Sequence, residues 1–269
     1  MPRNKAVDLI LFAGQSNMAG RGNAIDAPYC PQEAGLEYRA ISAPERLFPI
    51  AEPFGLHENV PGQIDDDAKK SGSLVSAFVA RYHQLTGRTV IAVSASEGGT
   101  STQQWLDGLA SDAASRLAQA RGFLESSGFV LQNIFVLWCQ GETDGDYAVS
   151  AAQYIQNFGR IWQMFRAAGA QCCGLIQIGH YNQSVYPEGR YGISGTVLDA
   201  QYGVIRDAQR KIVSSDTDVF SAGSFAPYEG QMKDQFHYRQ CAYNEVGEEA
   251  AEKCAAYLPC EQIVVNCLQ

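Results

Sequence analysis

The sequence predicts an α/β fold, a three-layer α/β/α sandwich built on a flavodoxin-like parallel sheet of five strands. Five short runs are almost continuously apolar, as is typical of parallel strands that are covered on both faces. Helical patterns separate these runs, and strands that alternate with helices form parallel sheets with right-handed crossovers. Because 269 residues with 46% hydrophobic content can bury a large core, we expect a single domain over residues 1–269.

The predicted elements follow one another in regular alternation. The strands are expected at Val7–Ala13, Thr89–Ala95, Asn133–Cys139, Cys172–Ile178 and Thr217–Ser221. The helices are expected at Ser71–Leu85, Leu106–Ser126, Tyr147–Ala168, Val197–Val213 and Glu245–Tyr257. Three of these helices are followed by a glycine where a C-cap is needed, at Gly87, Gly128 and Gly169.

One stretch interrupts this alternation. Residues 23–70 contain several prolines and aspartate-rich turns and show no clear period. Long loops without regular structure are often functional in compact domains. We therefore expect this stretch to be a loop that covers the functional site.

Composition excludes two classes of partner. The net charge is −9 and no basic patch is visible, which argues against nucleic-acid binding. No run of 18 apolar residues occurs, so we expect neither a transmembrane helix nor a membrane partner. Arg3 and Lys5 precede the first apolar run, as in a signal peptide, but the run ends in Gly-Gln-Ser-Asn rather than at a small-residue cleavage site. We interpret it as the first strand of the fold.

The eight cysteines do not form a metal or redox motif. No CxxC pair occurs, which argues against a zinc ribbon or a thioredoxin-like site. Cys139, Cys172 and Cys173 lie in strand-like runs and are expected to be buried thiols. A cluster at the C-terminal end could form a disulfide if the protein is exported; it comprises Cys254, Cys260 and Cys267.

Polar, glycine-rich segments follow four of the predicted strands, and the fifth strand leads toward Asp234 and His237. The four segments are Gly14–Asn17, Ser96–Ser101, Gln140–Asp144 and Gly179–Asn182. In an open α/β sheet, ligands bind beyond the carboxyl ends of the strands. Each segment alone could be an ordinary turn or cap, but their convergence on one edge predicts a catalytic crevice.

Three of these residues have the chemistry of a serine hydrolase. Ser16 lies in a glycine-flanked strand-to-helix turn and is the candidate nucleophile, which needs an adjacent base. His237 is the candidate base because imidazole titrates near neutrality. Asp234, three residues earlier, can hold the other ring nitrogen and stabilise the imidazolium.

The remaining candidates would bind the oxyanion and the substrate. Oxyanion donors are expected from the backbone N–H of Ser16, the backbone N–H of Gly98 or Gly99, and the side-chain amide of Gln140. This mechanism needs no metal or organic cofactor. Candidate substrate contacts lie beside the nucleophile or near the strand ends: Gln15, Asn17, Trp105, His180, Tyr181 and Tyr228.

The motifs resemble those of the SGNH/GDSL hydrolases, and among them the carbohydrate esterase family six and sialate O-acetylesterase group. Gly14–Gly20 resembles the nucleophile block GQSNMxG, and Gly98–Ser101 with Trp105 resembles the glycine block GGTS with a tryptophan a few residues on. Gln140–Asp144 resembles the QGExD block, and Asp234–His237 the DxxH block. The four blocks occur in the family's order and span Val7 to about Gly247.

The resemblance implies the same fold and the hydrolysis of small acyl esters, usually acetyl groups on sugars. It implies Ser16 as nucleophile, His237 as base, and Gly98 or Gly99 with Gln140 as oxyanion donors. The family has been described with either the DxxH aspartate or the QGE glutamate as acidic partner, so Glu142 competes with Asp234. We favour Asp234 because its proximity in sequence makes the contact with His237 easy to form.

We therefore expect a serine carbohydrate O-acetylesterase of the acetylxylan type that works through an acyl-enzyme. The acidic chain suits neutral xylan-type glycans better than sialic acids, and a sialate O-acetylesterase is the alternative. An acyltransferase would share the acyl-enzyme and differ in the acceptor. A glycan-binding module with vestigial catalytic residues is the alternative from another class, and the intact motifs argue against it. A nucleotide-binding protein would need a phosphate loop that Gly14–Asn17 does not provide.

Overall fold

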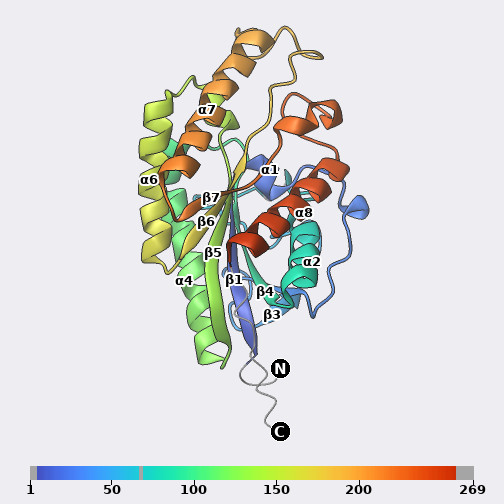
Figure 1. Ribbon diagram of the computed structural model, residues 1–269, viewed down its shortest axis with the longest axis vertical. Coiled ribbons are helices and arrows are strands. Elements are labelled where there is room, and N and C mark those ends of the chain that lie inside the picture. The colour runs from blue at the N-terminus through green and yellow to red at the C-terminus, as the bar shows by residue number, and fades with distance from the viewer. Residues whose placement is uncertain (1–4, 67–68, 259–269) are drawn as a thin grey trace.

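The structure, a computed structural model, describes residues 5–66 and 69–258. It confirms the three-layer α/β/α sandwich, with one central sheet between two layers of helices (Figure 1). The strands lie in the order β3-β2-β4-β1-β5-β6-β7, and all neighbouring pairs are parallel except β2 and β3. Their bounds are β1 (Ala6–Gly14), β2 (Gly35–Tyr38), β3 (Leu47–Pro49), β4 (Thr89–Ser96), β5 (Val130–Cys139), β6 (Cys172–Gln177) and β7 (Val219–Ser224).

The five predicted strands correspond to β1, β4, β5, β6 and β7. Counted among themselves they lie in the order 2-1-3-4-5, which is the flavodoxin-like arrangement. The prediction of five strands is wrong, because the sheet has seven strands within the described residues. The two additional strands, β2 and β3, come from the 23–70 stretch. They have only four and three residues, which is too short for a hydrophobic period to reveal them.

Helices cover both faces of the sheet (Figure 1). One face packs against α4 (Ala110–Ser126), α6 (Ala151–Ala167) and α7 (Gly195–Ser215), and the other against α2 (Val75–Thr86) and α8 (Gln240–Tyr257). Short helices follow three strand ends, namely α1 (Ser16–Ala19), α3 (Thr102–Gln104) and α5 (Glu142–Asp146). The other short elements are η1 (Ala24–Asp26), η3 (Trp105–Leu109) and η4 (Ala226–Gln231).

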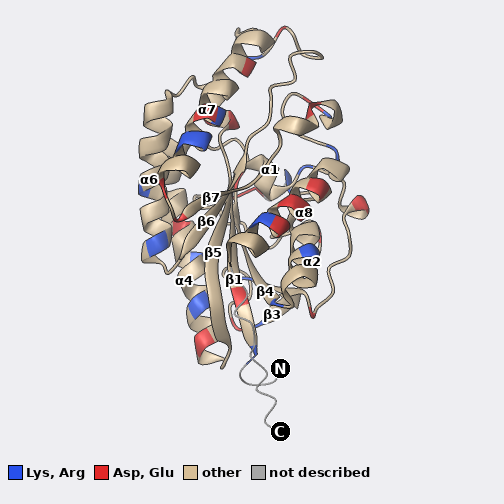
Figure 2. Cartoon of the chain, in the orientation of Figure 1, with Lys and Arg blue, Asp and Glu red and all other residues tan. Residues whose placement is uncertain are grey.

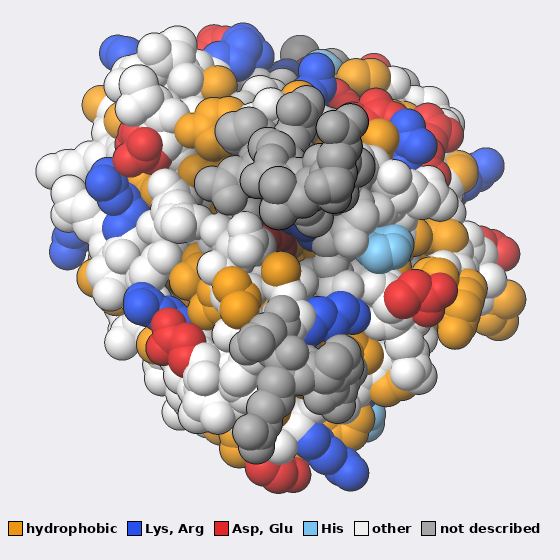
Figure 3. All heavy atoms as spheres, turned by 60° about the horizontal axis from the view of Figure 1, so that its bottom comes forward, with side chains coloured by type: hydrophobic (Ala, Val, Ile, Leu, Met, Phe, Trp, Pro, Cys, Tyr) orange, Lys and Arg blue, Asp and Glu red, His pale blue; other side chains and the backbone are white. Residues whose placement is uncertain are grey.

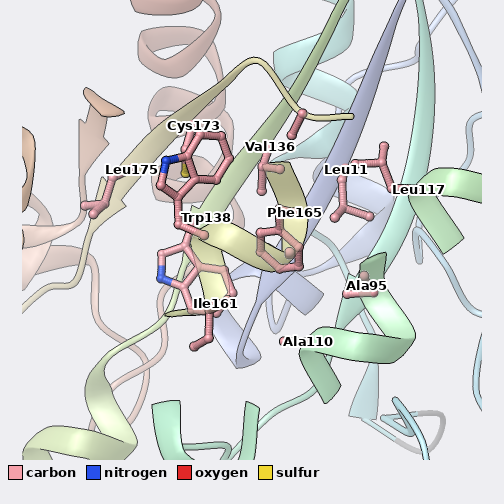
Figure 4. Close-up of a cluster of buried hydrophobic side chains, with 14 of the residues drawn as sticks. Leu11, Ala95, Ala110, Leu117, Val136, Trp138, Ile161, Phe165, Cys173 and Leu175 are labelled. Atoms are coloured by element: carbon pink, nitrogen blue, oxygen red, sulfur yellow. The ribbon is translucent and has the colours of Figure 1, made fainter. Parts of the chain in front are cut away.

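Alternate side chains of β1 enter the two halves of the core. Leu11 packs on the side of α4 and α6, whereas Phe12 packs on the side of α2 and α8. On the first side, the Trp138 ring lies 6.1 Å from the ring of Phe165, and Figure 4 shows this pair beside Ile161. Burial of each such side chain stabilises the fold by about 2–3 kcal/mol. This packing fixes the helices against the sheet, and with them the loops at its carboxyl edge.

Acidic and basic residues are spread along the helices rather than gathered by sign (Figure 2). On the face seen in Figure 3, basic and acidic side chains are interspersed rather than gathered by sign. Among the described residues, no helix is long and apolar enough to cross a membrane.

The structure confirms that Cys139, Cys172 and Cys173 are buried thiols. Cys254 is also buried. A C-terminal disulfide lies outside the described part of the chain, because Cys260 and Cys267 both follow residue 258.

Candidate active site

The carboxyl ends of three adjacent strands meet at the same level. Gly14, the last residue of β1, pairs in register with Ser96 of β4 and Cys139 of β5. Beyond this edge lies an open cavity of about 200 Å³ whose wall includes Ser16 and His237. The sheet topology therefore brings segments that are far apart in sequence to one site, at the point where the strand order reverses.

Ser16 is held at this edge by a tight turn between β1 and α1. Gly14 has φ +141°, and a Cβ atom there would lie 2.0 Å from the Cys139 carbonyl oxygen. Only glycine allows this close approach. The Gln15 N–H then donates to the same carbonyl at 2.9 Å. The turn is thus fixed against β5, and Ser16 begins α1 with 4% of its surface exposed.

Ser16, His237 and Asp234 form a continuous hydrogen-bonded chain. His237 Nε2 lies 3.0 Å from Ser16 Oγ, and His237 Nδ1 lies 2.9 Å from Asp234 Oδ2. The second carboxylate oxygen, Oδ1, accepts the backbone N–H groups of Phe236 at 3.0 Å and His237 at 2.8 Å. A hydroxyl, a base and an orienting carboxylate therefore stand in the geometry of an activated nucleophile.

The environment of Asp234 keeps its carboxylate charged. Burial acts to raise its pKa, but the hydrogen bond and charge of His237 and the two backbone N–H groups outweigh burial and lower the pKa to about 2. Asp234 is therefore ionised at neutral pH and can stabilise an imidazolium on His237.

Glu142, the competing acidic partner, does not contact His237 through a hydrogen bond. It is 3% exposed, and its Oε1 accepts from Asn17 Nδ2 at 2.6 Å. Asn17 in turn accepts from the Tyr243 hydroxyl at 2.7 Å and donates to the Phe236 carbonyl at 3.1 Å. Asn17, predicted as a substrate contact, instead ties the nucleophile helix to the loop that carries His237. Its three polar neighbours occupy the amide, which corrects that prediction.

Glu142 predicts a measurable pH dependence of stability. Burial raises its pKa from 4.5 to about 7. Between these values the folded protein binds more protons than the unfolded chain, so stability falls as pH rises through this window. Glu142→Gln keeps an oxygen acceptor for Asn17 and cannot ionise. We expect thermal denaturation to show a smaller loss of melting temperature from acidic to neutral pH in this variant than in the wild type.

The matched control for this measurement is Glu248→Gln, on an exposed position of α8. It should follow the wild-type pH dependence. Equal pH dependence in the wild type and Glu142→Gln would contradict the assigned pKa.

The predicted glycines lie at the cavity, and Gly98 lies against the nucleophile. Gly98 and Gly99 both line the cavity. A Cβ atom on Gly98 would lie 3.2 Å from the Cβ of Ser16 and 2.4 Å from Arg21 Nη2. The absence of a side chain therefore lets the backbone after β4 approach Ser16, which is the placement that a backbone oxyanion donor requires.

Gln140 lies elsewhere than predicted. Its side chain is fully buried and does not belong to the cavity wall. Its Nε2 donates to the Thr100 carbonyl at 3.0 Å and to Asp144 Oδ2 at 2.5 Å. The amide joins the segment after β4 to α5, because both segments need a buried donor there. This placement corrects its prediction as an oxyanion donor.

The predicted aromatic contacts also lie outside the cavity wall. Trp105 is fully buried, and its Nε1 donates to Thr100 Oγ1 at 3.0 Å. Tyr181 is fully buried 6.0 Å from the Tyr202 ring. Tyr228 packs against the core on the side of α8. These rings hold loops onto the core, so the prediction that they are substrate contacts is corrected.

Of the two remaining predicted contacts, Gln15 lines the cavity and His180 does not. Gln15 Oε1 accepts the Gly141 N–H at 3.1 Å, which joins the ends of β1 and β5. His180 Nδ1 is instead hydrogen-bonded to Asp199 Oδ1 at 3.0 Å. His180 is therefore bonded within the protein, outside the cavity wall, where its prediction as a substrate contact is not met.

Several cavity residues were not predicted. They are Arg21, Lys69, Thr143, Asp146, Tyr147, Arg190, Tyr191, Tyr202 and Phe236. Some lie within or next to the recognised motifs, and that position is a signal that could have identified them. Arg190 and Tyr191, in the connection between β6 and α7, lie next to no recognised motif. The 23–70 stretch contributes Lys69 to the wall, and its Asp66 pairs with Arg21 at 2.7 Å.

A comparison with protein families places most of the chain in one of them. The model of a family described as "Carbohydrate esterase, sialic acid-specific acetylesterase" matches residues 6–256. No curated protein matches the chain.

Solved structures share the fold. A protein from Arabidopsis thaliana is 20% identical with a TM-score of 0.64, over 96% of this chain and 98% of that one. NanS is 13% identical with a TM-score of 0.59, and the match covers 96% of this chain and 98% of NanS. A structure described as a novel carbohydrate acetylesterase from Xanthomonas citri is 16% identical with a TM-score of 0.53, over 91% and 55%.

Proposed function

The chain belongs to the sialic acid-specific acetylesterase family of carbohydrate esterases, and on this premise we propose that Ser16, His237 and Asp234 are its catalytic triad. Membership makes the protein a carboxylic ester hydrolase, with an acetylated carbohydrate as substrate. The observation that carries the proposal is the hydrogen-bonded chain from Ser16 Oγ through His237 to Asp234, at the wall of an open cavity.

The reaction follows from this geometry. Ser16 Oγ attacks the acetyl carbonyl while His237 Nε2 takes its proton, and Asp234 stabilises the imidazolium. The backbone N–H groups of Ser16 and of Gly98 or Gly99 stabilise the oxyanion. His237 then protonates the departing sugar oxygen. A water molecule, deprotonated by His237, attacks the acyl-enzyme and releases acetate, which regenerates Ser16.

A neutral, acetylxylan-type sugar is the substrate that the charges of the cavity favour. Two arginines line the wall, and each is paired with a carboxylate. Arg21 lies 2.7 Å from Asp66, and Arg190 lies 3.0 Å from Asp146. Because these charges compensate one another, the arginines do not present a free positive charge to a substrate carboxylate.

An O-acetylated sialic acid is the second candidate. Lys69 is an exposed third cation of the cavity wall. An ammonium group at this position can attract the carboxylate of an acidic sugar, and the family description names sialic acid.

The deciding experiment compares the rates at which the wild-type protein hydrolyses different esters. We expect p-nitrophenyl acetate to be hydrolysed with a kcat/KM at least about tenfold above that of the butyrate, because a site for acetyl groups has no space for two further methylenes. Acetate release from acetylated xylo-oligosaccharides should exceed release from O-acetylated sialic acid. The reverse order, together with a selective loss on sialate in Lys69→Gln, would favour the second candidate. Absence of turnover with every ester would contradict the triad and favour a glycan-binding module.

A further inference from the structure

Two exposed tyrosines stand at the cavity that holds Ser16 and His237. Tyr147 is 61% exposed and Tyr191 is 66% exposed, and both line the cavity. They come from different segments, one directly after α5 and the other in the connection between β6 and α7. Exposed apolar rings at the mouth of a cavity are typical of a ligand-binding surface.

The backbone at Tyr191 is unfavourable for an aromatic residue. Arg190 and Ile193 exchange backbone hydrogen bonds of 3.1 and 2.9 Å around a two-residue turn. Its central residues, Tyr191 and Gly192, have φ +55° and +76°. Two positive φ values define a type I′ turn, which favours asparagine, aspartate or glycine at its first central position. Strained backbone conformations cluster at functional sites, and Tyr191 lines the cavity.

A salt bridge fixes the two tyrosines relative to each other. Arg190 and Asp146 immediately precede them in sequence, and Arg190 Nη1 lies 3.0 Å from Asp146 Oδ2. The other carboxylate oxygen accepts the Tyr202 hydroxyl at 2.9 Å. The guanidinium also lies 4.2 Å from the centre of the Tyr191 ring. The bridge therefore sets the spacing between the end of α5 and the turn.

We propose that Tyr147 and Tyr191 form an aromatic platform that receives the pyranose ring of the acetylated sugar, with Arg190 and Asp146 as its positioning residues. The proposal rests on the proposed function of the same site. One face of a pyranose presents C–H groups and packs on an aromatic ring, while its hydroxyls remain in water. A sugar held in this way presents its acetyl ester to Ser16. The platform selects sugar esters over esters without a sugar.

The test is the ratio of kcat/KM for a sugar ester to kcat/KM for p-nitrophenyl acetate, which has no pyranose. The sugar ester is whichever of acetylated xylobiose and O-acetylated sialic acid the wild type hydrolyses better. We expect Tyr147→Ala and Tyr191→Ala each to lower this ratio about tenfold, and the Phe variants to retain most of it. Tyr29→Ala, at an 80% exposed tyrosine outside the cavity wall, is the control and should leave the ratio unchanged.

Tyr191→Asn separates binding from folding. Asparagine suits the turn better, so we expect the melting temperature to rise by about 1–2 °C while the ratio falls as in Tyr191→Ala. A ratio that stays at the wild-type value in the Ala and Asn variants would overturn the platform.

The wild type distinguishes failure of the platform from failure of the proposed function. Hydrolysis of a sugar ester by the wild type, with an unchanged ratio in the tyrosine variants, would overturn the platform alone. Absence of turnover with p-nitrophenyl acetate would overturn the triad on which the platform rests.

Discussion

Ser16→Ala is expected to lower kcat for p-nitrophenyl acetate by about four orders of magnitude or more, because no acyl-enzyme can form without the hydroxyl. Ser16 Oγ is the atom to which His237 Nε2 points, at 3.0 Å. Only the backbone donors would still act on a water molecule in the variant. The measurement is steady-state hydrolysis, combined with covalent labelling of the serine by a fluorophosphonate.

Ser115→Ala is the control for this prediction, because Ser115 is an exposed serine of α4 outside the cavity wall. It should retain wild-type turnover and labelling. Substantial turnover by Ser16→Ala would show that another nucleophile, or water activated by His237, carries the reaction.

Asp234→Asn is expected to lower kcat by about three to four orders of magnitude. The asparagine amide can no longer stabilise the imidazolium, and an N–H turned toward Nδ1 would favour the wrong tautomer of His237. Glu142→Gln should cost far less activity, because Glu142 is hydrogen-bonded to Asn17 and not to His237. The variant with the larger loss of kcat identifies the acidic partner of His237. A larger loss of kcat in Glu142→Gln would assign that role to Glu142 instead of Asp234.

The dependence of kcat/KM on pH supplies a second test of Asp234 as the acidic partner. Since the pKa of Asp234 is about 2, its carboxylate stays charged well above that pH. Protonation of Asp234 should therefore not be the cause of any loss of kcat/KM on mild acidification.

The core strands and the proposed triad could be predicted from the sequence because their signals are local. A buried parallel strand is a short apolar run, and five such runs gave the central part of the sheet. Asp234 reaches His237 across three residues, so their contact is already present in the local chain. Ser16 and the segment around Gly98 follow strands, and parallel strands place their carboxyl ends at one edge.

Tertiary structure alone decided which side chains face the cavity. Gln140 and Trp105 belong to recognised motifs, yet both are buried, because packing and hydrogen bonds to Thr100 direct their side chains inward. The contact between Asn17 and Glu142 joins residues 125 positions apart. No local pattern specifies such a contact.

The tyrosines of the proposed platform show the same limit of sequence reasoning. Tyr147 and Tyr191 approach the cavity only because α5 and the turn after β6 meet through Arg190 and Asp146. The sequence thus determined the layers of the fold and predicted the residues of the proposed triad. The direction of each side chain depends on long-range packing, so the walls of the cavity were decided by the tertiary structure.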